Sequence, residues 1–233
     1  MSIYASAMSV RVDIVSIGAL SRNLLWKETR PVRTSHSTCS LIRTRKRTIL
    51  VDPGLPASAM VARLQERTGL RPGEIDLVFL TNFRPSHRAG LGAFENATVF
   101  LHENESYHVR AHLERLLEEL DPGDEDAERV RAELAVLGRC QNPPDQLDEQ
   151  VDLFPLFGHT PGQCGLLVTG TTLTTLIAGD AIATLDHFLA GQLLPDPHQL
   201  EQAKESLEEA YEIADMIVPG HDNAFLNPRT HGI

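Results

Sequence analysis

Hydrophobic residues in the first third of the chain occur in short runs, and turn-forming residues separate these runs. The runs at residues 10–17, 37–44 and 48–52 are rich in β-branched side chains, which is typical of strands. Residues 57–68 differ, because their apolar side chains recur at helical intervals and Gly69 follows as a common helix terminator. The pattern therefore predicts three strands and then one amphipathic helix.

The same order of strands followed by a helix occurs again later in the chain. Further strands are predicted at residues 75–81, 98–101, 151–157, 164–169, 173–178 and 216–218, with a helix at residues 198–213. Strands followed by helices, occurring twice, favour two packed sheets with helices on the outside. A chain of 233 residues can bury a substantial core in this way, and we expect residues 1–233 to form a single domain.

Residues 104–148 differ in composition from the segments on either side. They are acidic, and Leu113, Leu116, Leu117 and Leu120 form one apolar stripe at helical spacing. We predict an inserted helical hairpin. Such a stripe is typical of core packing, and a lid over a site and a homodimer contact are the alternatives.

Charge and composition restrict the partners that the protein can have. The formal net charge of −11 argues against nucleic acid, whose binding depends on clustered Lys and Arg. Cys39, Cys140 and Cys164 are an odd number without paired spacing, which favours a reducing compartment over a disulfide framework. The chain shows no signal-peptide pattern and no run of about 20 apolar residues. We therefore predict a cytoplasmic protein that binds neither nucleic acid nor a membrane.

Four polar residues stand at the ends of predicted strands or in the loops that follow them: His87, His159, Asp180 and His221. Imidazole and carboxylate are ligands that zinc and iron accept, and the Gly and Pro residues beside them allow tight turns. A single histidine after a strand is more often a structural residue. The interpretation as a metal site therefore depends on the four residues together.

Five segments resemble, in sequence and in order, those of the metallo-β-lactamase superfamily. They are ILVDPG at residues 49–54, the loop at residues 81–90, GHTPG at residues 158–162, AGD at residues 178–180 and VPGH at residues 218–221. The resemblance spans nearly the whole chain. It implies an α/β fold, a four-layer αβ/βα sandwich into which the helical segment around residues 104–148 is inserted. It also implies a metal-dependent hydrolase that acts on a small-molecule ester, thioester, lactone or phosphodiester.

The metal-binding loop departs from the pattern of the family that it resembles. The family pattern is Thr-His-x-His-x-Asp-His-x-x-Gly, and residues 81–90 read TNFRPSHRAG. By this resemblance, a first metal would need ligands at positions 82, 84 and 159, and only His159 remains. Arg84 is always protonated and offers no lone pair, so it would repel a cation. We expect the first metal site to be lost.

The second metal site of the family is better preserved. By resemblance it would use positions 86, 87 and 221 with Asp180 as a bridging ligand, and only the carboxylate at position 86 is replaced, by Ser86. Three protein ligands and an open position still make an acceptable catalytic site. We therefore expect at most one metal ion, zinc or iron, at His87, Asp180 and His221.

The residues around this site indicate how a substrate would be bound. Ser86 cannot take a proton as the missing carboxylate would, so hydrolysis should be slow. Arg84 would hold the oxyanion of the substrate, and Asn82 would lie beside it. Trp26 lies in residues 21–33, a loop that overhangs the site in the family. It is interpreted either as an aromatic flap over the substrate or as a core residue.

An alternative interpretation needs no metal. Arg84 would pair with Asp180 and neutralise it, because a guanidinium is well shaped to bind a buried carboxylate. The protein would then be a non-catalytic pseudoenzyme in which Asn82, Arg84 and His159 bind an anionic ligand such as a carboxylate or a phosphate. Bound metal that depends on the two histidines of the second site would discriminate between the interpretations.

Overall fold

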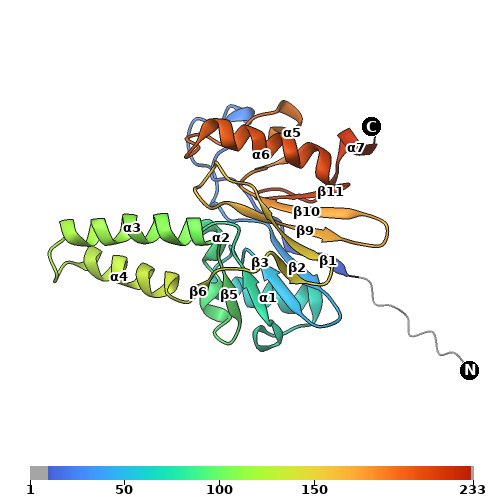
Figure 1. The fold of residues 1–233 in the computed structure, drawn as a ribbon. Coiled ribbons are helices and arrows are strands. Elements are labelled where there is room, and N and C mark those ends of the chain that lie inside the picture. Colours follow the sequence, from blue (N-terminus) through green and yellow to red (C-terminus); the bar gives the residue numbers. More distant parts are fainter. Residues whose placement is uncertain (1–9, 232–233) are drawn as a thin grey trace, which may run out of the picture.

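Two β-sheets packed face to face form the centre of the protein, whose computed structural model describes residues 10–231 (Figure 1). The first sheet has the strand order β1-β2-β3-β4-β5-β6, with β1 (Arg11–Ser16), β2 (Cys39–Arg43), β3 (Thr48–Val51), β4 (Leu77–Phe79), β5 (Thr98–Phe100) and β6 (Cys140–Gln141). Strands β1, β2 and β3 pair antiparallel, and strands β3 to β6 pair parallel.

The second sheet is mostly antiparallel. Its order is β12-β11-β10-β9-β8-β7, with β7 (Gln146–Asp148), β8 (Val151–Pro155), β9 (Cys164–Thr169), β10 (Thr174–Gly179), β11 (Met216–Pro219) and β12 (Phe225–Leu226). Strands β10 and β11 pair parallel, whereas the other neighbours in the described part of this sheet pair antiparallel. The carboxyl ends of β10 and β11 therefore lie side by side at one edge of the sheet.

Alternating side chains in the central strands divide the core into layers. In β3, Ile49 and Val51 pack between the two sheets, whereas Leu50 packs on the outer face of the first sheet. In β10, Ile177 packs between the sheets and Leu176 packs on the outer face of the second sheet. Because successive side chains of a strand point to opposite faces, both sheets are buried on both sides.

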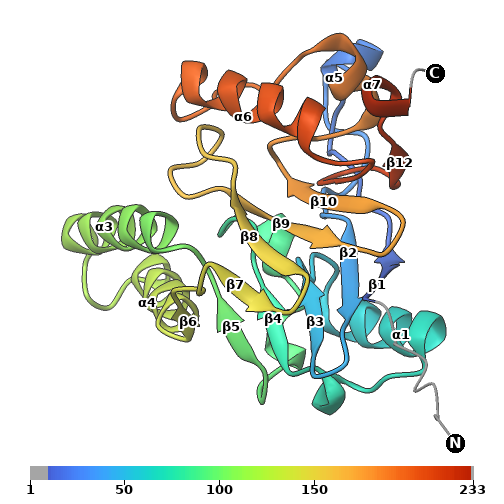
Figure 2. The ribbon, with the colours of Figure 1, turned by 45° about the vertical axis from the view of Figure 1, so that its right-hand side comes forward.

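Helices cover the outer face of each sheet (Figure 2). The helix α1 (Ala57–Thr68) packs Met60 and Leu64 against the first sheet, and α5 (Leu185–Ala190) and α6 (Leu200–Ile213) cover the second. The remaining short elements are α2 (Pro85–Arg88), α7 (Pro228–His231) and the 3-10 helices η1 (Leu24–Trp26), η2 (Pro72–Glu74) and η3 (Leu91–Ala93). This is the four-layer αβ/βα sandwich that the sequence predicts.

The predicted helical insertion is a hairpin of α3 (Glu103–Glu119) and α4 (Glu125–Leu137) that extends away from the sheets (Figure 1). Its leucine stripe is half-buried where the two helices pack against each other. The helical part is shorter than the predicted range 104–148, because β6 and β7 follow α4 and form edge strands of the two sheets. A homodimer contact through this hairpin stays a prediction.

One buried carboxylate joins the base of the hairpin to two loops that carry candidate site residues. Glu105, in the first turn of α3, is 3% exposed. It accepts hydrogen bonds from the backbone N–H groups of Phe83 at 3.1 Å and Gly162 at 2.9 Å, and from the hydroxyl of Thr160 at 2.7 Å. A Cβ at position 162 would lie 2.1 Å from the backbone nitrogen of Glu105, so the loop can approach α3 this closely only with glycine there.

The sequence predictions place most of the regular elements correctly. Helix α1 spans the predicted residues 57–68, and Gly69 ends it in the left-handed conformation with φ 76°. Helix α5 was missed, because six residues are too few to show helical periodicity. None of the described helices is both long and apolar enough to cross a bilayer. Residues 1–9, which belong to the N-terminal segment expected to contain no signal peptide, lie outside the described range.

Candidate metal centre

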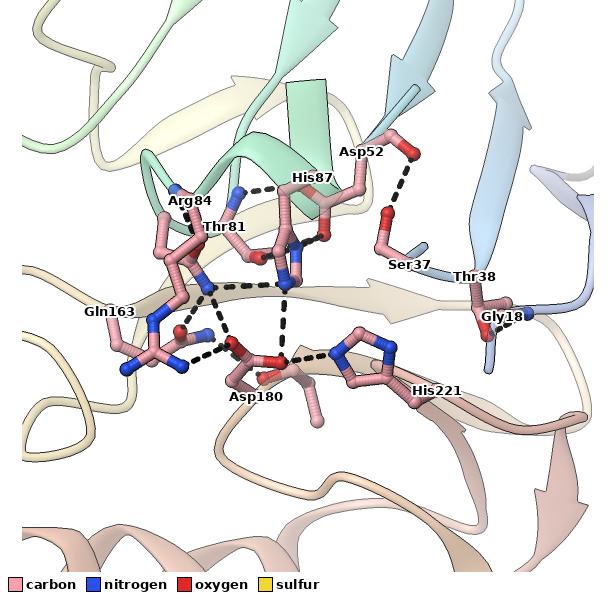
Figure 3. Close-up of polar contacts among 12 residues, drawn as sticks. Gly18, Ser37, Thr38, Asp52, Thr81, Arg84, His87, Gln163, Asp180 and His221 are labelled. Atoms are coloured by element: carbon pink, nitrogen blue, oxygen red, sulfur yellow. Dashed lines mark hydrogen bonds and ion pairs between the residues drawn. The ribbon is translucent and has the colours of Figure 1, made fainter. Parts of the chain in front are cut away.

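Two candidate ligands project from the parallel pair of strands in the second sheet. Asp180 directly follows β10, and His221 stands two residues after the end of β11. The pairing register of the two strands shifts just before Gly179, which has φ 55°. A Cβ on Gly179 would lie 2.5 Å from the hydroxyl oxygen of Thr81, so glycine is needed for this close approach. Asp180 thereby faces the loop that follows β4 (Figure 3).

His87 comes from α2 and is held by a carboxylate at the end of β3. Its Nδ1 lies 2.9 Å from Asp52 Oδ2. Asp52 also accepts hydrogen bonds from the backbone N–H and the hydroxyl of Thr81, at 2.9 and 2.7 Å, and it has φ 50°, which is uncommon for a residue other than glycine. All three residues are buried. Because the carboxylate accepts, His87 donates through Nδ1 and directs Nε2 towards Asp180.

His221 is oriented in the same way by a backbone carbonyl. Its Nδ1 lies 2.9 Å from the carbonyl oxygen of His36, which can only accept, so Nδ1 carries the proton. Nε2 of His221 then lies 2.9 Å from Asp180 Oδ1, and Nε2 of His87 lies 3.1 Å from the same oxygen. Both imidazoles thus present the same ring nitrogen to one carboxylate oxygen (Figure 3).

The side chains of His87, Asp180 and His221 fit a metal ion. Each offers one ligand atom, these atoms all lie within 4.8 Å of one another, and all three residues are buried. Two nitrogens and one carboxylate oxygen suit zinc or iron. Both Nδ1 atoms are engaged elsewhere, so the Nε2 lone pairs are the ones available to an ion. Ser86, at the position of the family's carboxylate, lies on the wall of the cavity beside them.

Buried charges shift the protonation of these residues. Burial alone would lower the pKa of His87, but the charges of Asp180 and Asp52 and the hydrogen bonds to them raise it to about 10. Burial opposes ionisation of Asp180, yet His87 and His221 hold the pKa of Asp180 well below its usual range. A proton on His87 therefore balances the carboxylates when no ion is present. Metal binding would displace this proton.

The residues at the expected first metal site do not fit an ion. The amide nitrogen of Asn82 donates to Gln163 Oε1 at 2.9 Å and to Asp180 Oδ2 at 3.2 Å, and its amide oxygen accepts from the backbone N–H of Arg84 at 2.9 Å. A donor nitrogen therefore stands where an ion would need a ligand. Apart from Asp180, His159 is the one residue of this expected set that offers a ligand atom.

Arg84 is held loosely beside the centre. Its guanidinium lies 3.8 Å from Asp180 Oδ2, which is too far for a hydrogen bond, and its side chain is 44% exposed. The ion pair with Asp180 that the pseudoenzyme interpretation expects is therefore present only as a loose contact without a hydrogen bond. Asp180 instead has closer partners in His87, His221 and Asn82.

His159 lies beside the centre without a partner of its own. The residue is 4% exposed, and neither ring nitrogen has a hydrogen-bond partner among the described residues. Its Nε2 lies 3.8 Å from Asp180 Oδ2, outside the three-residue ligand group. Burial lowers the pKa of His159 to about 4, so the ring is neutral. Its role as a metal ligand stays a prediction.

Gln163 is a site residue that the sequence analysis missed. It is fully buried, accepts a hydrogen bond from Asn82 and donates one from Nε2 to the carbonyl oxygen of Ala178 at 3.1 Å. It thereby sets the direction of the Asn82 amide. The sequence signal was one polar residue between the GHTPG segment and the apolar strand β9.

A cavity of about 240 Å³ lies beside the ligands, and Asp180, His221, Arg84, Arg22 and His187 are among its lining residues. His187 is buried, its Nδ1 lies 2.8 Å from the hydroxyl of Thr184, and burial lowers its pKa. The imidazole of His187 is therefore neutral.

Trp26 lines a second cavity of about 190 Å³ that also reaches His221. Trp26 is 54% exposed, and its indole nitrogen donates to Asp186 Oδ2 at 2.6 Å. The interpretation of Trp26 as a core residue is therefore wrong, because its loop runs over the surface. Its contact with a substrate stays a prediction.

Known proteins share this fold. The family model of the metallo-beta-lactamase superfamily matches residues 32–221. A Thermotoga maritima protein, solved as a candidate metallo-beta-lactamase, is 20% identical with a TM-score of 0.67, and the match covers 94% of this chain and 99% of that one. No curated protein matches significantly.

Two further solved structures contain a bound acyl-homoserine. A mutant of the B. thuringiensis protein AiiA, with N-decanoyl-L-homoserine at its active site, is 19% identical with a TM-score of 0.63 and coverage of 92% of this chain and 93% of that one. AidC, a dizinc quorum-quenching lactonase in complex with a product, is 16% identical with a TM-score of 0.63 and coverage of 91% and 84%. Identity at this level shows the fold alone. The family match, which ends at the candidate ligand His221, shows more than the fold: the chain belongs to the metallo-beta-lactamase superfamily.

Proposed function

We propose that the protein is a metal-dependent hydrolase that binds one zinc or iron ion at His87, Asp180 and His221. The observation that carries the proposal is that both ring nitrogens of both histidines face oxygen acceptors. A neutral imidazole has only one N–H to donate, so even with the additional proton on metal-free His87 the two rings supply three N–H groups for four such contacts. A cation at the shared oxygen of Asp180 removes this conflict, because each Nε2 then acts as a ligand.

The ion and the residues around it would have separate roles in hydrolysis. When bound, the ion would supply Lewis acidity and an activated water for hydrolysis of an ester, thioester, lactone or phosphodiester. Arg84, half-exposed on the cavity wall, would hold the oxyanion that develops on the substrate. Ser86 has a neutral hydroxyl where the family has a carboxylate, so it would bind the substrate but not take a proton. Turnover should therefore be slow.

Similar structures support a hydrolase without selecting a substrate. AidC is described as a lactonase, and the AiiA structure holds an acyl-homoserine at its active site. A lactone is thus one of the substrate classes to test, beside esters, thioesters and phosphodiesters.

Metal content tests the proposed centre directly. The protein would be purified without a polyhistidine tag or a chelator and measured by elemental analysis. We expect about one zinc or iron per chain, lost in a His87→Ala/His221→Ala variant. A His108→Ala/His112→Ala variant is the matched control, because both histidines are exposed on α3. No bound metal in the unaltered protein, even after incubation with zinc, would overturn the proposal.

Turnover by an Arg84→Gln variant tests the role of the guanidinium. With a substrate found by screening the four classes, we expect kcat/KM to fall about 100-fold while the metal content stays the same. Unchanged kinetics would remove Arg84 from the mechanism.

A further inference from the structure

Two arginines from separate segments line the cavity beside the metal ligands. Arg22 precedes η1, and Arg84 precedes α2. The chain as a whole carries a net charge of −11, so this concentration of positive charge is a local exception. Asp180 is the one acidic residue that lines the cavity within the described chain, and its carboxylate is already bound by His87 and His221. The cavity is therefore electropositive before any metal ion is added.

The hydrogen-bond donors of both guanidinium groups are free to bind a ligand. Arg22 is exposed and has no hydrogen bond or ion pair within residues 10–231. Arg84 has one anionic neighbour, at 3.8 Å. Two arginines outside the cavity are engaged, because Arg33 pairs with Glu28 and Arg88 with Glu133. A guanidinium carries five N–H donors in a planar fork that matches carboxylate and phosphate oxygens.

The two arginines differ in their distance from the ligands. Arg84 contacts Asp180 and so stands next to the reacting bond, whereas Arg22 contacts no metal ligand. Arg22 is therefore placed for a part of the substrate that does not react. The cavity of about 240 Å³ is smaller than the 300 Å³ or so at which sites for drug-sized ligands begin, and Leu20, Leu24 and Leu194 form an apolar wall. A compact substrate with a short apolar part fits this space.

We propose that Arg22 recognises a permanently anionic group, a carboxylate or a phosphate, on a compact substrate whose reacting bond lies at Arg84 and the metal ligands. Only the placement of the reacting bond at Arg84 and the metal ligands rests on the proposed hydrolase function. Anion binding at Arg22 can be measured without turnover, so the two proposals can fail separately.

Binding of simple anions tests the proposal first. Succinate and inorganic phosphate would each be titrated calorimetrically into the protein as purified, and the tighter of the two identifies the anionic group. Loss of a charged hydrogen-bond partner should weaken binding at least about tenfold in Arg22→Gln, and Arg22→Lys should recover part of the loss. Arg30→Gln is the matched control, because Arg30 is exposed in the same loop and outside the cavity. Equal affinity in Arg22→Gln and the unaltered protein, or no binding to either, would overturn the proposal.

Turnover of a matched ester pair tests it a second time. The esters are 4-nitrophenyl acetate, which is neutral, and 4-nitrophenyl hemisuccinate, which carries a carboxylate. We expect kcat/KM to favour the hemisuccinate, and the ratio of the two values to fall about tenfold in Arg22→Gln but not in Arg30→Gln. An equal ratio in all three proteins would overturn the proposal while leaving the hydrolase function intact. Arg22-dependent anion binding without hydrolysis of either ester would support the anion site at Arg22 and remove esters from the substrate classes of the proposed hydrolase.

Discussion

The two halves of the centre around Asp180 differ in how firmly their side chains are held. On one side, His87 and His221 have both ring nitrogens engaged at distances of 2.9 to 3.1 Å. On the other side, the guanidinium of Arg84 lies 3.8 Å from Asp180 Oδ2, and neither ring nitrogen of His159 has a hydrogen-bond partner in the part of the chain that the structure describes. The loosely held side contains positions 82 and 84, where the sequence departs from the family pattern, whereas the two histidines of the other side keep the family residues.

The two histidines are held firmly because acceptors from other segments orient them. His87 is directed by Asp52 at the end of β3, and His221 is directed by the carbonyl of His36. Neither contact involves the altered positions 82 and 84. The comparison teaches that His87 and His221 are oriented by hydrogen bonds to other segments, so the changes at positions 82 and 84 leave their orientation intact.

The largest effect, on metal content, is expected from restoring the family's ligands at positions 82, 84 and 86. An Asn82→His/Arg84→His/Ser86→Asp variant restores the family's ligands and removes the positive charge that repels a cation. We expect the metal content to rise from about one to about two ions per chain. Elemental analysis after incubation with zinc measures this, with Arg30→His as the control for an added surface histidine. A content that stays at one would show that ligands alone do not rebuild the site.

The next largest effect is expected from weakening the hydrogen bond by which Asp52 orients His87. Asp52→Asn keeps the size of the side chain but replaces an acceptor of the His87 Nδ1–H with a weaker one. We expect metal affinity to fall about 10- to 100-fold, measured by competition with a chelator. Asp126→Asn, on the exposed face of α4, should leave the affinity unchanged.

Protonation of His87 predicts a pH dependence of the metal-free protein. The pKa of His87 is raised to about 10 in the folded state, above the ordinary value of 6.5. The resulting stability is complete below pH 6.5 and is lost as the pH rises towards 10, by up to about 1.4 kcal/mol per pH unit. Urea unfolding at several pH values measures the decline. It should be absent in His87→Gln, and a decline of equal slope in that variant would contradict the assignment to His87.

The smallest effect is expected from a change at Glu105, whose carboxylate holds the loop of Phe83 and the loop of Thr160 and Gly162. Glu105→Gln keeps the shape of the side chain but weakens its three buried hydrogen bonds. We expect the free energy of unfolding to fall by about 1 to 2 kcal/mol. Chemical denaturation measures this, and Glu103→Gln at the exposed start of α3 is the control. Equal stability of the two variants would mean that Glu105 does not hold the loops.

The residues of the candidate second site could be singled out from the sequence because local turns present them. Asp180 and His221 each follow a short apolar strand and a glycine, and both features are visible in neighbouring residues. The contacts that orient the ligands could not be predicted, because Asp52 and His87 are 35 residues apart and His36 and His221 are 185 residues apart. Such pairs become neighbours only when the two sheets pack.

The position of the Arg84 side chain could not be predicted from the sequence either. The sequence places a guanidinium next to a buried carboxylate, and a tight ion pair is a reasonable expectation from charge alone. In the structure Arg84 is the residue before α2, its backbone N–H donates to Asn82, and its side chain remains half-exposed. Backbone geometry at the start of a short helix, which charge does not reveal, decides where this side chain lies.

The hairpin has a consequence for how proteins of this kind can diversify. Glu105 and Glu133 anchor it near its base, where Glu133 binds Arg88 next to the metal-binding loop. The rest of α3 and α4 extends away from both sheets (Figure 1). Whole helical turns can therefore be gained or lost at the tip without moving a ligand. The tip is a segment where length and surface chemistry can drift during evolution, independently of the selection that acts on the centre.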